Sequence, residues 1–257
     1  MIRFGQALKD KSFVTTVELE PPKGADLGPL QELAGEFSGR VDAVVLADNP
    51  RAEARLDPVM AAHKLLRHAE VEVILTLTCR DRNRLALTSQ MLGAAAAGVE
   101  SLLLVSGDFV SLGDHPGAKP VYDLDSVQAL QLARQLSQGQ DMSGNDLLGS
   151  PSFVLGAALS PQAEPLEAQL LKLRKKMQAG LDFIMTMPLT DQASYAKLKA
   201  QAGGLKLIAG VAADDPASRE EAAALVKELK SSGADGVHLS MAAAQEELPA
   251  LVNACGL

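Results

Sequence analysis

The chain has 257 residues, of which 47% are hydrophobic and 22% are charged, and its formal net charge is −8. This composition is typical of a globular protein with a sizeable core. Six Phe, two Tyr and no Trp leave that core aliphatic. Few rings and an acidic balance argue against nucleic-acid binding, which needs stacking surfaces and a basic footprint.

Two cysteines, Cys79 and Cys255, are too few for a disulfide framework and lack the spacing of a zinc site. The four histidines fall at helix, loop and mid-strand positions, so we expect no metal centre, and we expect His238 to be an interior residue. Residues 1–13 are charged and lack the apolar run of a signal peptide, and no segment reaches the ~18 apolar residues of a membrane span. We therefore expect a cytoplasmic protein without a membrane span.

Short apolar runs alternate with longer amphipathic segments along the whole chain. The predicted strands are 13–18, 41–47, 71–78, 101–106, 153–159, 183–187, 205–211 and 236–240, and the predicted helices include 83–97, 125–136, 165–179, 217–231 and 242–254. Mostly continuous apolar runs are typical of parallel strands that are covered on both faces. Gly98, Gly180 and Gly233 each stand between a helix and a strand, where a left-handed residue is favoured.

Eight such units without a low-complexity linker predict a single (β/α)₈ TIM barrel over residues 1–257. A doubly wound open sheet is the alternative fold. The chain has no G-x-G-x-x-G after the first strand and no G-x-x-x-x-G-K-[ST], which disfavours dinucleotide-binding and P-loop proteins. In a barrel of this kind, the active site lies at the C-terminal ends of the strands.

Polar residues cluster at those predicted strand ends. They are Glu18, Glu20, Asp48, Asn49, Thr78, Cys79, Asp108, Ser160, Asp214 and Ser240, with Met187 at the end of the sixth strand. Glu18 ends an apolar strand, and a carboxyl that is partly withdrawn from water keeps its proton more readily, which suits a proton donor. A structural acid paired with Lys or Arg is the alternative. Asp108 follows Gly107, where the backbone can approach a ligand closely, and a turn or helix-capping aspartate is the alternative there.

Two further segments carry candidate binding residues. Residues 107–123 form an unusually long connection, and we expect such a loop to cover a ligand at the catalytic face, a variable surface loop being the alternative. Lys172, Arg174, Lys175 and Lys176 lie on one predicted helix of an otherwise acidic protein, where 172 can share a face with 175 or 176. Such a cluster fits a phosphate or a polyglutamate chain, and it equally fits a solvated basic face.

Several segments resemble the methylenetetrahydrofolate reductase family. They are VELEPPKGAD, LTCRDRNR, LLLVSGD and KKMQAGLDFIMT, while GDHPGAKPVYDLDSVQAL and GADGVHLSMAAAQEELPALVNACGL look like the short, acetogen-type bacterial form. The resemblance runs over nearly the whole chain. It implies a (β/α)₈ barrel that binds FAD, or FMN, along the strand ends and reduces 5,10-methylenetetrahydrofolate to 5-methyltetrahydrofolate. It further implies NADH or an electron-donor protein subunit as partner, in a homo- or hetero-oligomer.

The resemblance also implies residue roles. Glu18 matches the acid that assists opening of the folate imidazolidine ring, and Asp108 matches the aspartate that approaches the pterin and tunes the flavin. The positions around the flavin correspond to Thr78, Cys79, Ser106, Gly107, Asp108, Ser160, Glu164, Lys175 and Lys176. Met187 stands where the family has a glutamine that contacts the pterin, and methionine lacks the amide. Two alternatives are a flavin-independent reductase that uses NADH directly and a non-catalytic folate-binding or assembly paralogue.

Overall fold

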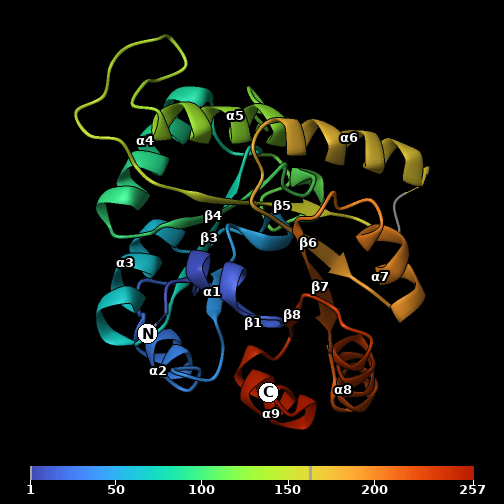
Figure 1. Cartoon of the computed structure of the whole chain (residues 1–257). Helices are drawn as coiled ribbons and strands as arrows, with labels where there is room; N and C mark the ends of the chain where they lie inside the picture. The colour runs from blue at the N-terminus through green and yellow to red at the C-terminus, as the bar shows by residue number, and fades with distance from the viewer. Residues whose placement is uncertain (1, 162–163) are drawn as a thin grey trace.

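The computed structural model describes residues 2–161 and 164–257 and contains a closed barrel of eight parallel strands in sequence order, with β1 paired to β8 (Figure 1). The strands are β1 (Val14–Leu19), β2 (Ala43–Leu46), β3 (Val73–Thr78), β4 (Ser101–Val105), β5 (Val154–Leu159), β6 (Phe183–Pro188), β7 (Lys206–Ala212) and β8 (Gly236–Ser240). The predicted fold is confirmed, and each predicted strand boundary lies within two residues of the observed one.

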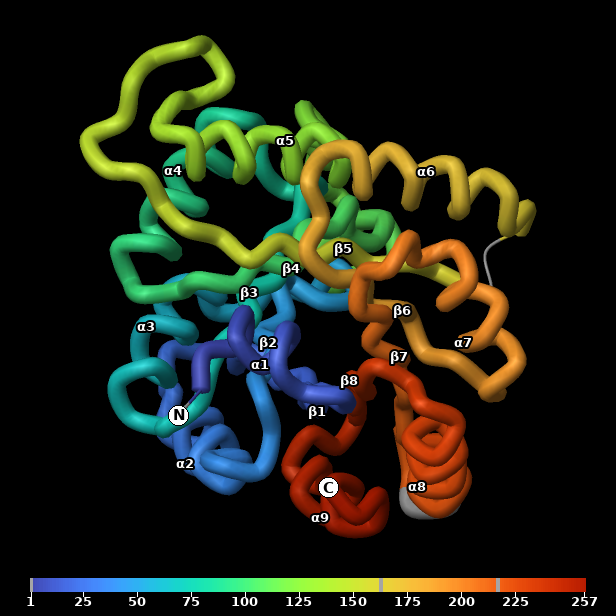
Figure 2. Tube along the Cα trace, in the orientation of Figure 1, coloured from blue at the N-terminus to red at the C-terminus, as the bar shows by residue number. Residues whose placement is uncertain are grey.

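Helices between the strands form the outer ring of the barrel (Figures 1 and 2). They are α2 (Gly28–Gly35), α3 (Pro58–His68), α4 (Arg84–Ala96), α5 (Ser126–Ser137), α6 (Leu166–Gln178), α7 (Gln192–Lys199) and α8 (Pro216–Ser231), and α9 (Leu248–Cys255) follows β8. A further helix, α1 (Phe4–Asp10), precedes β1, and the short 3₁₀ turns are η1 (Pro50–Ala52), η2 (Val110–Leu112) and η3 (Gln245–Glu247). Gly98, Gly180 and Gly233 have φ of +93°, +93° and +81°, as predicted.

The prediction of a helix over 242–254 was wrong at its start. The helix α9 begins only at Leu248, after the 3₁₀ turn η3. Pro249 is the reason, because proline has no N–H to donate and its ring clashes with the preceding turn, so that a helix accepts it only in its first turn. The charged segment 1–13 also contains a helix, α1, that was not predicted.

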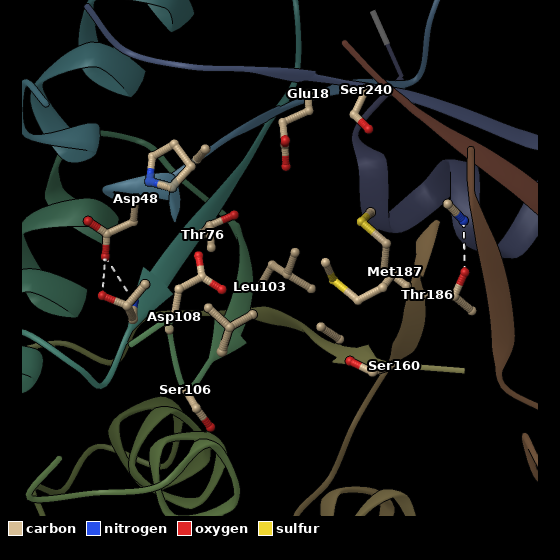
Figure 3. A pocket seen from close by; sticks show the side chains of 18 of the residues that line it. Glu18, Asp48, Thr76, Leu103, Ser106, Asp108, Ser160, Thr186, Met187 and Ser240 are labelled. Carbon is tan, nitrogen blue, oxygen red and sulfur yellow. Dashed lines mark hydrogen bonds between the residues drawn. The ribbon is translucent and has the colours of Figure 1, made fainter. Parts of the chain in front are cut away.

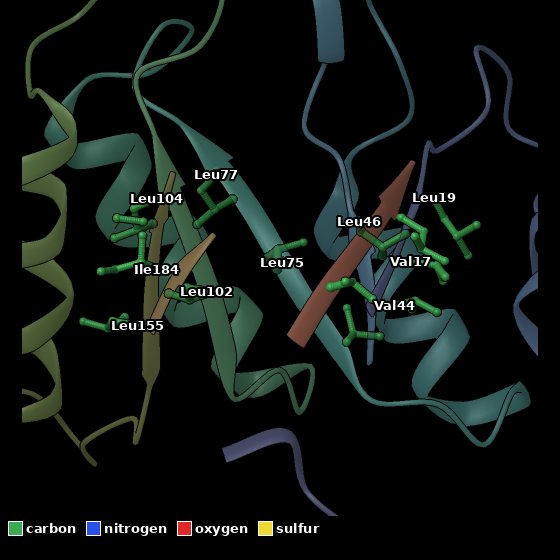
Figure 4. Packing of buried hydrophobic residues seen from close by; sticks show 14 of the residues in the cluster. Val17, Leu19, Val44, Leu46, Leu75, Leu77, Leu102, Leu104, Leu155 and Ile184 are labelled. Carbon is green, nitrogen blue, oxygen red and sulfur yellow. The ribbon is translucent and has the colours of Figure 1, made fainter. Parts of the chain in front are cut away.

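Alternating side chains along each strand divide the core into two parts. Outward-facing residues such as Val17, Val44, Leu75 and Leu102 are fully buried against the helices (Figure 4). A second, smaller cluster of buried side chains fills the inside of the barrel. Its members are Phe4, Leu8, Val14, Ala43, Val45, Ile74, Leu103, Phe183, Met185 and Ile208. The barrel interior is therefore a packed core rather than a pore.

The helix α1 closes the N-terminal end of this interior. Phe4 is fully buried and packs edge-on against Phe183, with 5.3 Å between the ring centroids. Gly156 makes room for the Phe183 ring, because a Cβ at this position would lie 2.1 Å from the ring Cζ. The two apolar rings thus fill the N-terminal end of the barrel interior.

A repeated polar contact ties neighbouring strands together at the same end. Aspartates that precede β2, β6 and β8 each accept a hydrogen bond from a backbone N–H of the preceding strand. These are Asp42 from Thr15 at 2.8 Å, Asp182 from Leu155 at 2.7 Å and Asp235 from Leu207 at 2.8 Å, and the three aspartates form ion pairs with Lys11, Arg134 and Lys199. The carboxylates therefore satisfy backbone donors where strands begin.

Candidate active site

A cavity of about 590 Å³ lies at the C-terminal ends of the strands. Its wall is built by inward-facing residues that continue the alternation of the barrel interior. Glu18, Asp108 and Met187 point toward the same space, from β1, the β4–α5 loop and β6 (Figure 3). The strands thus bring together side chains as far apart in sequence as Glu18 and Ser240. The cavity lies at the C-terminal ends of the strands, where active sites of this fold are expected.

Glu18 lies beside His238, which is buried as predicted. The Glu18 carboxylate Oε2 is 3.7 Å from Nε2 of His238, and the His238 Nδ1 shares a hydrogen bond of 3.0 Å with the Thr16 hydroxyl. The Glu18 side chain is 29% exposed and that of His238 is 8% exposed. Within residues 2–161 and 164–257, no Lys or Arg forms an ion pair with Glu18. Glu18 is therefore free to meet a ligand in the cavity.

Thr78 and Asp48 form a closed polar unit in the cavity wall. The backbone N–H and the hydroxyl of Thr78 both donate to Asp48 Oδ2, at 2.8 and 3.1 Å. The Arg82 guanidinium donates to both carboxylate oxygens of Asp48, at 2.6 and 3.0 Å. Because these groups satisfy one another, we assign the unit to the support of the wall rather than to chemistry.

Cys79 does not line the cavity. It is fully buried in the outer core between the strands and the helices, and its burial raises the pKa of its thiol to about 11. The alternation along β3 explains the position, because Thr76 and Thr78 face the cavity and the next residue must face the other way. The neutral thiol packs as a small apolar group.

Asp108 holds an adjacent loop in place. Its Oδ2 accepts a hydrogen bond of 2.9 Å from the backbone N–H of Arg51, which has a left-handed φ of +54°. The Arg51 guanidinium in turn donates to both oxygens of the buried Glu20, at 2.6 and 2.9 Å. Gly107, with φ of +90°, allows the close approach, since a Cβ there would lie 2.9 Å from that of Arg80.

The long connection predicted at 107–123 is present between β4 and α5, with η2 as its only regular turn. It is anchored by Asp114, which accepts hydrogen bonds from the Ala54 N–H at 3.0 Å and the Lys23 ammonium at 3.1 Å. Gly113 packs against the backbone of Ala52, so closely that a Cβ there would overlap the Ala52 carbonyl. The loop thus joins the β1 and β2 connections into one rim around the cavity.

Two lysines of the predicted basic cluster on α6, Lys172 and Lys176, reach the cavity, and of these only Lys176 is among the flavin positions that the resemblance implies. Lys176 is 6% exposed and donates to the Ala158 carbonyl at 2.8 Å, and Lys172 lies 3.5 Å from the Ser106 hydroxyl. Burial and then the neighbouring charge of Lys172 lower the pKa of Lys176 to about 8. Lys175 is exposed on the helix surface and does not line the cavity, although its spacing would allow it to share a face with Lys172.

Of the remaining predicted residues, some line the cavity and one lies outside it. Ser106, Ser160 and Met187 line the cavity. Glu164 is exposed and lies outside it, at the start of α6. A residue that was not predicted, Ser126 at the start of α5, is 1% exposed and lines the cavity. Among the described residues, its hydroxyl is one of the few buried side-chain groups that has no hydrogen-bond partner.

Comparison with known proteins identifies the family. The sequence profile of methylenetetrahydrofolate reductase matches residues 3–213. The chain belongs to the methylenetetrahydrofolate reductase family. A probable methylenetetrahydrofolate reductase (NADPH) of Caenorhabditis elegans is 26% identical over 137 residues, which are 53% of this chain and 19% of that protein. The match therefore spans about a fifth of the curated relative.

Solved structures resemble this member of the reductase family in fold. A 2,3-dimethylmalate lyase has a TM-score of 0.63 at 14% identity, over 98% of this chain and 85% of the other. A tryptophan synthase α-subunit of Pyrococcus furiosus has a TM-score of 0.60 at 16% identity, over 95% and 98%. At this identity the likeness concerns the barrel alone.

Residues 2–161 and 164–257 contain neither a membrane-spanning helix nor a cluster of metal-ligating side chains. No helix there is long and apolar enough to cross a membrane. In the same ranges, no group of three or more His, Cys, Asp or Glu side chains is arranged to hold a metal ion.

Proposed function

We propose that this chain is a flavin-dependent reductase that converts 5,10-methylenetetrahydrofolate into 5-methyltetrahydrofolate. The observation that carries the proposal is the Glu18 carboxylate, which faces the same cavity as Lys172 and Lys176. A proton donor and a cationic wall in one cavity suit acid-assisted ring opening next to a phosphate-bearing cofactor. Membership of the reductase family supports the same reaction.

The residues of the cavity wall fit a flavin nucleotide. Lys172 and Lys176 offer two ammonium groups, and the buried hydroxyl of Ser126 lacks a hydrogen-bond partner among the described residues. A phosphate group would accept charge-assisted hydrogen bonds from the two ammonium groups, and such bonds are among the stronger hydrogen bonds. When bound, a reduced flavin supplies the hydride that the methylene carbon of the folate accepts.

The chain's own residues would handle the proton. Glu18, in its protonated form, would donate to N10 of the folate and open the imidazolidine ring, which leaves a cationic methylene group on N5 ready for hydride. His238 lies 3.7 Å from Glu18 and is tethered to Thr16, so it would keep the carboxyl oriented toward the cavity. Asp108, next to the cationic methylene, would favour positive charge there.

Other parts of the proposal concern the whole protein. We propose that residues 1–257 act as a single catalytic domain in the cytoplasm, in a homo- or hetero-oligomer. The electrons would come from NADH or from a donor protein, both of which would have to reach the open mouth of the cavity. FAD and FMN both carry a phosphate group that Lys172 and Lys176, the lysine wall of the cavity, would bind.

The purified protein tests the proposal through its visible spectrum and its folate-dependent oxidation of NADH or a reduced dye. We expect flavin absorption bands, or their appearance after addition of FAD or FMN, and turnover only when flavin is present. Turnover without flavin would instead favour direct transfer from NADH. Folate binding without any turnover would favour a non-catalytic folate-binding paralogue.

A further inference from the structure

Among the described residues, Lys176 is the one lysine that the fold buries. Its amine donates a hydrogen bond of 2.8 Å to the Ala158 carbonyl on β5, and both residues line the cavity. The amine therefore lies at the cavity wall and not in the outer core. Within residues 2–161 and 164–257, no carboxylate forms an ion pair with Lys176. The fold thus places an amine without a paired carboxylate where a ligand can meet it.

The titratable groups around this amine come from three elements. Lys172 lies about one turn earlier on α6 and also lines the cavity. Asp125 precedes α5, and its Oδ1 already accepts hydrogen bonds from two backbone N–H groups of that helix, each at 2.8 Å. Cys79 follows β3 as a neutral thiol, because burial raises its pKa to about 11. Burial and the charge of Lys172 outweigh the charge of Asp125, so the pKa of Lys176 falls to about 8.

Such a lysine is a nucleophile near neutral pH. About a tenth of its amine is neutral at pH 7, whereas less than about 0.1% of an ordinary lysine is neutral at that pH. Lysines that form imines with carbonyl compounds in enzymes are activated in the same two ways, by removal from water and by a neighbouring cation. Lys176 therefore combines the two features that this chemistry needs with direct access to a cavity.

We propose that, in the flavin-free protein, Lys176 forms an imine with an aldehyde that carries a phosphate group. The neutral amine attacks the carbonyl carbon, a C–N double bond replaces the C–O double bond, and the oxygen leaves as water with the two amine protons. No oxidant or reductant takes part. Lys172 holds the phosphate, because it stands four residues, or about 6 Å along the helix, from the reacting amine. Its ammonium lies 3.5 Å from the Ser106 hydroxyl, which is a second polar group on that side of the cavity.

The inference goes beyond the proposed reaction and gives the cavity a form of regulation. The aldehyde and the flavin phosphate use the same two lysines, so each excludes the other. Imine formation is reversible in water. A rise in a phosphorylated aldehyde therefore lowers the share of the protein that can bind flavin, without permanent loss of the protein.

The experiment treats the flavin-free full chain with pyridoxal 5′-phosphate, traps the imine with borohydride and locates the label by peptide mass spectrometry. We expect about one label per chain, on Lys176, formed at least about tenfold faster than on any exposed lysine. The rate at Lys176 should rise about tenfold from pH 7 to pH 9 and then level off, because the amine is by then mostly neutral. The rate at an exposed lysine should still rise at pH 10.

A second aldehyde and three variants assign the roles. The compound 5′-deoxypyridoxal has the aldehyde but no phosphate, and it should label Lys176 at least about tenfold more slowly. Lys176→Arg should remove the label, because it keeps the charge but not the nucleophilic amine. Lys172→Met should reduce the preference for the phosphorylated aldehyde to less than about threefold. Lys175→Met is the matched control and should be labelled like wild type, since Lys175 is exposed and outside the cavity.

Two results would overturn the inference. One is a label spread over exposed lysines with no excess at Lys176, and the other is a wild type that reacts equally fast with both aldehydes. Added FMN tests the proposed function separately, and it should slow the labelling of Lys176 at least about tenfold. Fast labelling of Lys176 that FMN does not slow would support the imine and contradict the flavin site of the proposed function.

Discussion

The two ends of the barrel use the same strands for opposite purposes. At the N-terminal end, inward side chains such as Phe183 are apolar and covered by α1, and carboxylates such as Asp42 are paired with backbone donors and a cation. At the C-terminal end, the same alternation presents Glu18, Lys176 and Met187 to a cavity. The polar side chains that face a cavity are thus collected at one end, while the apolar packing and paired carboxylates of the other end hold the strands in register.

The C-terminal end itself contains two kinds of polar residue. Asp48 and Glu20 are buried and bound to arginines on both carboxylate oxygens, so that they support the wall. The Ser126 hydroxyl has no partner in the described ranges, and Lys172 reaches only Ser106 at 3.5 Å. Residues with spare hydrogen-bonding capacity next to a cavity are the ones that a ligand can use.

The largest effect on stability should come from the closed end. Phe4→Ala removes a fully buried ring that packs on Phe183 and leaves a void under the barrel. We expect the free energy of unfolding to fall by about 3–5 kcal/mol, the range for large-to-small aromatic substitutions in cores. Urea unfolding measures it. An F4A protein that loses less than about 1 kcal/mol would contradict the role of α1 as a plug.

A smaller loss is expected at the repeated polar contact of the same end. Asp42→Ala removes the acceptor for the Thr15 N–H and the partner of Lys11. We expect a loss of roughly 2–3 kcal/mol, because a backbone donor is left unsatisfied and a charged hydrogen bond is lost. The KM for folate should stay the same, and a change in KM at unaltered stability would show that the two ends are not separate in function.

The lysine wall of the open end should give a pH-dependent effect. Burial lowers the pKa of Lys176 from the ordinary 10.5 to about 8, so that about half of this lysine is neutral at pH 8 in the free protein and most of it at pH 9. A bound phosphate stabilises the charged form, and flavin affinity should therefore fall by up to tenfold per pH unit above about 8. Titration of the apoprotein with FMN at pH 7, 8 and 9 measures this slope.

Lysine variants test whether Lys172 and Lys176, which line the cavity, bind the flavin phosphate rather than Lys175 and Lys176, which the family resemblance implies. Lys172→Met and Lys176→Met should each weaken FMN binding roughly tenfold at pH 7, and K176M should abolish the pH slope. Lys175→Met is the matched control, because its side chain is exposed outside the cavity. An equal loss of FMN affinity in K175M and K172M would contradict the assignment of Lys172 to the phosphate-binding wall of the cavity.

Much of the fold and part of the site could be predicted from sequence, because both depend on local patterns. Apolar runs gave the strands, and strand ends indicated Glu18 and Asp108. Strand alternation would also have excluded one predicted residue, because Cys79 follows Thr78 on the opposite face of its strand. Helix spacing allowed both Lys175 and Lys176 to share a face with Lys172, and only the structure shows that Lys176 lines the cavity.

Other features depend on contacts that no local pattern contains. His238 looked like an interior residue, and only closure of β8 against β1 brings it to Glu18. Ser126 is the first residue of a helix in sequence, where a serine is unremarkable. Among the described residues its hydroxyl has no partner, and this depends on how α5 packs against β4, which the sequence does not specify residue by residue.

The central claim is that Glu18 supplies the proton for ring opening at the open end. The most direct measurement is reoxidation of the pre-reduced, flavin-loaded protein by 5,10-methylenetetrahydrofolate in a stopped-flow spectrometer, with wild type and Glu18→Gln compared. We predict that E18Q binds flavin like wild type and is reoxidised at least about 100-fold more slowly, as expected for loss of a general acid. Reoxidation of E18Q at the wild-type rate would contradict the claim.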